Sequence, residues 1–240
     1  MVLIDELNTP KAIQKVVALF NKGYSPIIVF TGEMRCGKTT KAYLIAQWLS
    51  WLLFKKRWDW KNCVITDIRQ FVEHIDSSRE EILFLDEVQG FLNAKEWYSS
   101  KNIIFNKIIQ SQAYKHMIFI LVLPYALGMA KDHRRLIHML FWIKNRKVVM
   151  PVLWKKKFWS LEETPSSYFF YPIIRFNYDS AIVKKCFKDE LAELPYFLKH
   201  IETVVKQGIM EDIKIKLKMK YDPSKKMSDT NIPHWVKDLL

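Results

Sequence analysis

The segment with the clearest chemical meaning is a glycine-bounded octapeptide of the form GxxxxGKT. The apolar run 26–31 before it predicts a buried strand, and the run 41–54 after it predicts a helix. In such a strand–loop–helix unit, backbone N–H groups and the helix N-terminus surround a phosphate. We expect Lys38 to reach the β- and γ-phosphates of a nucleotide and the Thr39 hydroxyl to bind Mg²⁺. The expected nucleotide-binding residues are Gly32, Glu33, Met34, Arg35, Cys36, Gly37, Lys38, Thr39 and Thr40.

A second candidate motif is an apolar run that ends in two adjacent acids, within residues 81–87 (EILFLDE). A buried strand of this kind delivers one carboxylate to a metal and the next to a water molecule. We expect Asp86 to hold Mg²⁺, usually through a coordinated water. We expect Glu87 to orient and deprotonate the water that attacks the γ-phosphate. The alternative is a core strand followed by two solvated acids.

The two motifs together resemble the P-loop NTPases that use a catalytic glutamate, which include AAA+, RecA-like, ABC and FtsK–HerA proteins. The chain contains neither the Asn-Lys-x-Asp motif of GTPases nor the LSGGQ motif of ABC proteins. A helical pattern at 102–115, an apolar run at 116–124 and an Asp-x-Arg-Arg segment at 132–135 follow. In this order they are most similar to FtsK–HerA ATPases, especially the small Zot-like and packaging-type members of archaeal viruses and plasmids. The resemblance covers residues 24–145.

The resemblance implies several further features. One extra strand should lie between the motifs, and residues 62–66 are its candidate. ATPases of this division usually form rings, in which Arg134 or Arg135 would reach a neighbour's γ-phosphate as a catalytic residue; both could equally be helix-end cations. The family's polar sensor should end the fourth strand, where this chain has Leu-Pro-Tyr. Three alternatives stay open: Tyr125 substitutes, Gln110 or Gln112 serves, or the strand is assigned wrongly.

The composition fits a cytosolic protein with one large core. The chain has 240 residues, 50% of them hydrophobic, and its three cysteines imply no disulfide framework. We expect a cytoplasmic location, the host cytoplasm for a viral protein. No signal peptide is expected, and no uncharged run reaches the length of a membrane span. The histidines show no metal-binding spacing with cysteines or acids, so no zinc site is assigned.

The pattern predicts an α/β fold: a mostly parallel sheet flanked by helices, with a β-hairpin and a helical C-terminal extension. Residues 1–145 are the expected ATPase core with an N-terminal helix at 11–21, residues 146–220 an extension packed on it, and 221–240 a mobile tail. The smaller elements are a helix start capped by Thr9-Pro10, a hairpin of 139–144 and 147–154, a strand within 166–176, and helices at 181–186 and 190–206, the last broken near Pro195.

The positive charge is concentrated in the second half of the chain. The net charge is +13; residues 1–120 hold 16 Lys and Arg against 12 acids, and residues 121–240 hold 22 against 13. Basic residues recur beside aromatics in three clusters, at 55–58, 142–147 and 154–159. Cationic side chains bind phosphates without sequence preference, and tryptophan stacks on bases, so we expect sequence-independent DNA binding. An acidic protein or membrane surface remains the alternative.

These observations together predict Mg²⁺-dependent ATP hydrolysis by a motor-type ATPase that acts on DNA in packaging, transfer or remodelling. We expect it to work as a homo-oligomeric ring, with a viral or plasmid protein as a further partner. One alternative is an AAA+-type remodelling or loading ATPase, which the lack of arginine in 190–206 disfavours. The other is a nucleotide-switched assembly or morphogenesis protein.

Overall fold

A computed structural model describes residues 9–65, 68–77, 81–86, 107, 116–124, 136–154, 168–170, 174–175 and 181–203. In chain order the elements are α1 (Lys11–Asn21), β1 (Ile27–Gly32), α2 (Lys38–Phe54), α3 (Trp60–Cys63), β2 (Val64–Ile65), α4 (Ile68–Ser77), β3 (Ile82–Asp86), β4 (Ile118–Val122), β5 (Met139–Asn145), β6 (Val148–Trp154), β7 (Tyr168–Phe170), β8 (Ile174–Arg175) and α8 (Ala181–Cys186). Residues 188–203 form a further helix, and none of the helices described is long and apolar enough to cross a membrane.

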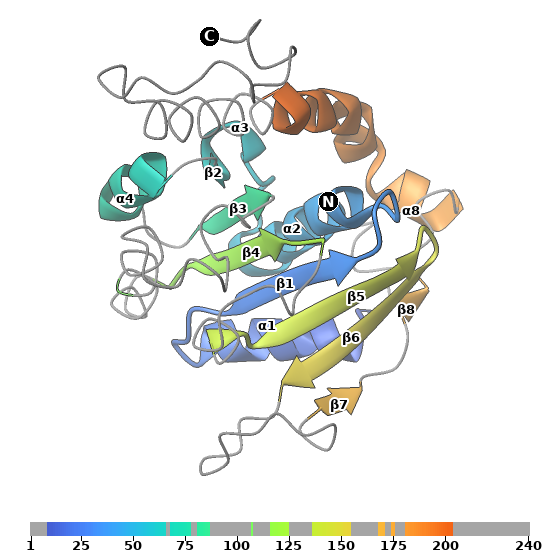
Figure 1. The fold of residues 1–240 in the computed structure, drawn as a ribbon, viewed down its shortest axis with the longest axis horizontal. Helices are drawn as coiled ribbons and strands as arrows, with labels where there is room; N and C mark the ends of the chain where they lie inside the picture. The colour runs from blue at the N-terminus through green and yellow to red at the C-terminus, as the bar shows by residue number, and fades with distance from the viewer. Residues whose placement is uncertain are drawn as a thin grey trace, which may run out of the picture.

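The described strands form one sheet in the order β2-β3-β4-β1-β5-β6-β7, with β8 also paired to β6 (Figure 1). Every neighbouring pair from β2 to β5 is parallel, whereas β6 pairs antiparallel with β5, β7 and β8. Parallel neighbours need crossover connections, and α4 lies in the one between β2 and β3. Helix α2 lies in the connection from β1 to β2, which are not neighbours in the sheet. The fold is therefore α/β with a mostly parallel sheet, as the sequence predicted.

The central strand is buried from end to end. All six residues of β1 are buried, between the parallel strands β4 and β5. Its Phe30 lies opposite Phe141 of β5, and the two rings stack with centroids 5.0 Å apart. A strand covered on both faces reads as a continuous apolar run, which is why residues 26–31 are recognisable in the sequence.

Helix α2 is also covered on nearly every side. Ten consecutive residues, 41–50, are buried, so this helix lacks the one-sided apolar stripe of a surface helix. The C-terminal helices supply part of this cover. The ring centroids of Tyr43 and Phe197 lie 4.5 Å apart, and those of Trp48 and Phe187 lie 6.2 Å apart. The helical C-terminal segment is thus part of the same core.

The two faces of the sheet are covered by different helices. Phe84 of β3 packs against Phe197, with centroids 5.4 Å apart, on the side of α2. Phe119 of β4 pairs in register with Leu83, one residue before Phe84, so it points to the opposite face. There it contacts Phe71 of α4, at a centroid distance of 6.0 Å. Consequently α4 covers the face that α2 and the C-terminal helices leave open.

Helix α1 has the predicted bounds but not the predicted cap. Its N-cap position is Pro10, and no side chain caps it, in contrast to the cap expected at Thr9-Pro10. The helix is held by its apolar side, from which Phe20 packs edge-to-face on Phe54 of α2, with ring centroids 5.5 Å apart.

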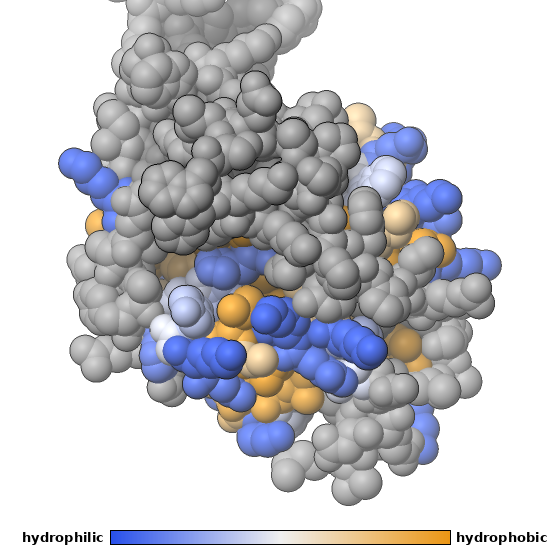
Figure 2. Space-filling model, turned by 90° about the horizontal axis from the view of Figure 1, so that it is seen from below, coloured by the Kyte–Doolittle hydropathy of each residue, from blue (hydrophilic) through white to orange (hydrophobic). Residues whose placement is uncertain are grey.

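On the side of the molecule seen in Figure 2, hydrophilic residues interrupt a hydrophobic area of the described surface.

Several smaller expectations need correction. Residues 62–66 are not all strand: α3 ends at Cys63 and β2 covers only Val64–Ile65, with residue 66 outside the described part. The helix 188–203 continues through Pro195. A proline costs a helix one hydrogen bond, and here burial of Phe197 and Ile201 on the same helix offsets that loss. Within 166–176 there are two short strands, β7 and β8, instead of one.

The hairpin is confirmed as β5 and β6, which are antiparallel and closed at residues 145–148. Asn145 closes the turn, since its Oδ1 accepts hydrogen bonds from the backbone N–H groups of Lys147 and Val148 at 2.8 and 2.9 Å. Because β5 also pairs with β1, this hairpin continues the central sheet across the boundary expected at residue 145.

Candidate nucleotide-binding site

Two parallel strands deliver the two motifs to one edge of the sheet. The phosphate loop follows β1, and Asp86 is the last residue of β3. Because β1, β4 and β3 run parallel, their carboxyl ends share this edge, where α/β proteins bind ligands. In the sheet, the strand between the two motif strands is β4. The candidate at 62–66 lies between the motifs only along the chain, since β2 is on the outer side of β3.

Glycine is required at both ends of the loop for different reasons. Gly32 has φ 150°, and a Cβ there would lie 2.3 Å from the carbonyl oxygen of Ile143 on the neighbouring strand β5. Gly37 is the N-cap of α2 in the left-handed region, at φ 87°, a conformation that glycine adopts without strain. The two glycines therefore allow the chain to leave β1 against β5 and to enter α2 in a tight turn.

The Lys38 side chain folds back over the loop. Its Nζ donates hydrogen bonds to the carbonyl oxygens of Gly32 and Glu33, at 3.0 and 2.7 Å. The tip of the loop is open to solvent: Glu33, Met34 and Arg35 are exposed, whereas Cys36 is buried beneath it. The ammonium group is thus held at the mouth of the loop by two uncharged oxygens.

A hydrogen bond joins the two motifs. The Thr39 hydroxyl donates to Oδ2 of Asp86 at 3.2 Å. A hydroxyl and a carboxylate are the hard oxygen ligands that Mg²⁺ prefers, and adjacent ligands of an octahedral Mg²⁺ lie about 2.9 Å apart for bonds of 2.0–2.1 Å. The separation and chemistry of this pair therefore fit a magnesium site at the mouth of the loop.

The hairpin turn also reaches the loop, which the sequence did not reveal. Lys41, one turn into α2, is fully buried, and its Nζ donates to the backbone oxygen of Arg146 at 2.7 Å. The Cγ of Arg146 lies 3.9 Å from where a Cβ on Gly37 would be, so this exposed arginine stands beside the loop. Burial lowers the pKa of Lys41 to about 8, while the nearby Cys36 acts in the opposite direction.

The remaining expected site residues divide into two groups. Thr40 is half-buried in the first turn of α2, next to Thr39. The others lie outside the described residues, although Glu87 directly follows Asp86 in the chain: Glu87, Gln110, Gln112, Tyr125, Arg134 and Arg135. Their catalytic roles stay predictions.

The first basic–aromatic cluster, at 55–58, does not form the exposed nucleic-acid surface that was expected. Trp58 is buried at 4% exposure, and its indole N–H donates to the Ile82 carbonyl at 2.8 Å. Neighbouring Arg57 forms an ion pair with Glu193 at 3.3 Å. Trp58 therefore belongs to the core and cannot stack on a base. In the second cluster, by contrast, Trp142 is 45% exposed.

No protein-family model and no curated protein matches the sequence. The solved structures that resemble the chain are P-loop NTPases. One is the N-terminal domain of zonular occludens toxin from Neisseria meningitidis, at 15% identity over 68% of this chain and 98% of that one, with a TM-score of 0.42. Another is the genome packaging NTPase B204 from Sulfolobus turreted icosahedral virus 2 in complex with ATP-γS, at 10% identity over 62% of this chain and 97% of that one, with a TM-score of 0.40.

A third is the AAA domain of FIGL-1 in complex with ADP, at 13% identity, with a TM-score of 0.40. The match covers 56% of this chain and about half, 51%, of the FIGL-1 chain. For the present chain, the P-loop fold is evident from the sheet order and from the loop between β1 and α2.

Proposed function

We propose that this protein is a Mg²⁺-dependent P-loop ATPase that acts on DNA as a ring-forming motor, of the FtsK–HerA and Zot-like type. The observation that carries the ATPase part is the hydrogen bond between Thr39 and Asp86 at 3.2 Å. It places one oxygen ligand from each motif side by side, at the edge of the sheet where the phosphate loop opens. A phosphate chain in the loop would meet both.

The loop and Lys38 would bind the phosphates. Backbone N–H groups of residues 33–39 and the N-terminus of α2 offer donors and partial positive charge to an anion. Phosphate oxygens, which are charged, would attract the Lys38 ammonium more strongly than the two carbonyl oxygens that it contacts now. Thr39 and Asp86 would hold Mg²⁺, which neutralises charge on the phosphates when bound.

Glu87 is the proposed general base. It directly follows Asp86, the last residue of β3, in the chain. A carboxylate there would accept a proton from the attacking water as the water approaches the γ-phosphorus in line with the leaving oxygen. Arg134 or Arg135 of a neighbouring subunit would stabilise the charge that develops on the γ-phosphate, which is why a ring is proposed.

The exposed face of the hairpin supports DNA as the polymer. Trp142 and Lys144 are both exposed and alternate with buried residues, so they lie on the same face of β5. Arg146 and Lys147 extend this positive charge to the turn. The next cluster, Lys155–Lys157, follows β6 directly in the chain. Phosphates would bind the cations, and bases would stack on Trp142.

A charge-reversal experiment tests the DNA part of the proposal. Replacing Lys155, Lys156 and Lys157 together with Glu should weaken binding of a random duplex at least tenfold at low salt, because three phosphate contacts become repulsive. The matched control reverses three exposed lysines of the C-terminal helices: Lys184, Lys185 and Lys188. Fluorescence anisotropy at two salt concentrations measures both variants.

The control variant should bind almost as well as the wild type, and wild-type affinity should fall steeply with salt. Equal weakening by both triple variants would mean that net charge alone attracts the DNA. No binding by the wild type at low salt would contradict DNA as the partner and favour an acidic protein or membrane surface.

A further inference from the structure

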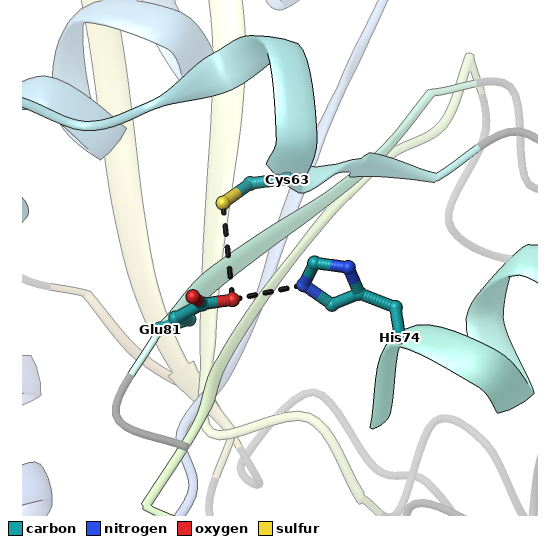
Figure 3. A group of neighbouring side chains, drawn as sticks. All are labelled: Cys63, His74 and Glu81. Carbon is teal, nitrogen blue, oxygen red and sulfur yellow. Dashed lines mark hydrogen bonds and ion pairs between the residues drawn. The ribbon is translucent and has the colours of Figure 1, made fainter. Parts of the chain in front are cut away.

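Three potential metal ligands that are scattered in the sequence meet at the end of the sheet away from the nucleotide site. Cys63 ends α3, His74 lies in α4, and Glu81 immediately precedes β3. Figure 3 shows their side chains pointing toward one another from these three elements. The spacings of 11 and 7 residues match no metal-binding motif, which is why the sequence did not indicate this group.

The distances between the three donor atoms suit a small cation. The Glu81 Oε2 lies 2.8 Å from Nε2 of His74 and 4.0 Å from Sγ of Cys63. All three donor atoms lie within 4.8 Å of one another. In a tetrahedral zinc site, bonds of about 2.0–2.3 Å place the ligand atoms about 3.3–3.8 Å apart. The nitrogen–oxygen pair would open by about 0.6 Å, a movement that side-chain rotation can supply.

Burial and charge point to the same kind of ion. Cys63 is buried at 5% exposure, while the His74 and Glu81 side chains are 19% and 30% exposed. A thiolate and a carboxylate would cancel the charge of a divalent ion, so the filled site would place no net charge in this half-buried position. Sulfur and imidazole favour zinc over Mg²⁺, which prefers oxygen ligands.

We propose that Cys63, His74 and Glu81 bind one Zn²⁺ ion, with the fourth position open to water or another donor. The ion would tie α3, α4 and the start of β3 together. It would lie about 16 Å along β3 from Asp86, given a rise of about 3.3 Å per residue over five residues. Its role is therefore to brace the strand that carries the nucleotide-site carboxylates, separate from the reaction itself.

Cobalt titration of the full-length protein tests this proposal. The protein is stripped with a chelator and titrated with Co²⁺ in excess Mg²⁺, so that the oxygen-lined nucleotide site is occupied by magnesium. We expect an intense thiolate-to-cobalt absorption band that saturates at one ion per chain and disappears when Zn²⁺ is added. Zn²⁺ should also raise the melting temperature of the stripped protein, because an ion that binds only the folded chain stabilises it.

Variants identify the ligands. Cys63→Ser should remove the thiolate band, and His74→Gln should weaken cobalt binding at least tenfold, as for the loss of one ligand. Cys186→Ser, which changes a cysteine on α8, is the matched control and should behave as the wild type. If Cys63→Ser fails to fold, as judged by its circular dichroism spectrum, the cobalt affinity of His74→Gln tests the proposal instead. The absence of a thiolate band in the wild type would overturn the proposal, and so would a band unaffected by either ligand substitution.

Discussion

At the scale of single residues, Lys41 is an unusual feature of the site. A lysine with 0% exposure in the helix that follows the phosphate loop would be costly without a partner. Here its ammonium group donates to the Arg146 backbone oxygen at 2.7 Å. Lys41 therefore joins α2 to the hairpin turn, and Thr39, two residues earlier, joins α2 to β3. One turn of helix fixes the loop relative to both neighbouring elements.

The protonation of Lys41 makes stability depend on pH. Its pKa is about 8 in the folded protein against an ordinary value of 10.5. Between these two values the unfolded chain binds more protons than the folded one, so this residue's contribution to stability rises with pH through that window. From pH 7 to 10, the free energy of unfolding of the wild type should increase relative to Lys41→Met by about 2–3 kcal/mol.

Urea unfolding of both proteins at several pH values measures this difference. Groups other than Lys41 titrate in both proteins, so their effects cancel when the two free energies of unfolding are subtracted. Parallel stability profiles for the wild type and Lys41→Met would show that Lys41 keeps its ordinary pKa when folded.

The contact between Lys41 and Arg146 could not be predicted from the sequence, whereas the main residues of the two motifs could. Lys38, Thr39 and Asp86 were recognisable because their neighbours in the chain impose the strand–loop–helix and strand-end context. Lys41 and Arg146 are 105 residues apart, and they meet only because β5 pairs with β1. In the sequence, Arg146 was one cation in a basic–aromatic cluster, and Lys41 was the first residue of a largely apolar helical run.

At the scale of elements, the β5–β6 hairpin connects the nucleotide site to the exposed face of the sheet. Its turn places Arg146 beside Gly37, while Trp142 and Lys144 of the same hairpin face solvent. A polymer that contacts this face would touch the element that also carries a cation to the phosphate loop. If DNA binds this face as proposed, the hairpin is the element that would link DNA binding to nucleotide binding.

Removing the Arg146 side chain should weaken nucleotide binding. We expect Arg146→Ala to raise the Kd for a fluorescent ATP analogue roughly 5–20-fold, as for the loss of a charged hydrogen bond to a phosphate. The contact of Lys41 with residue 146 should persist, because it uses the backbone oxygen. Lys144→Ala is the matched control, since Lys144 is an exposed cation on the same hairpin. Equal Kd values for both variants and the wild type would place Arg146 outside the nucleotide site.

The elements themselves were largely predictable, and the exceptions have physical causes. The bounds of α1 followed from periodicity, and the hairpin was predicted with its turn one residue early, since β5 runs to Asn145 and β6 begins at Val148. Pro195 was expected to break a helix, but the packing of Phe197 on Tyr43 and Phe84 keeps the helix continuous. Trp58 looked like part of a surface cluster because of its basic neighbours. Its indole instead packs on Tyr43 and Phe84 in the core.

At the scale of the whole molecule, the sheet order explains why two motifs far apart in the chain form one site. With β4 between β1 and β3, the phosphate loop and Asp86 open onto the same edge. The α/β class followed from the sequence because apolar strand-like runs alternate with helical ones. The strand order did not follow, since no local pattern shows which parallel strands become neighbours. For the same reason, the group formed by Cys63, His74 and Glu81 was visible only in three dimensions.

The central claim is that this edge hydrolyses ATP, and paired measurements of nucleotide binding and turnover test it most directly. Wild type, Lys38→Ala and Glu87→Gln are compared for ATP affinity and for phosphate release with Mg²⁺, with and without DNA. We expect the wild type to hydrolyse ATP and Lys38→Ala to be inactive. Glu87→Gln should bind ATP as the wild type does but release phosphate roughly 100-fold more slowly, as for a lost general base. A wild-type protein that binds ATP without turnover under all these conditions, or a Glu87→Gln variant with the wild-type rate, would contradict the account.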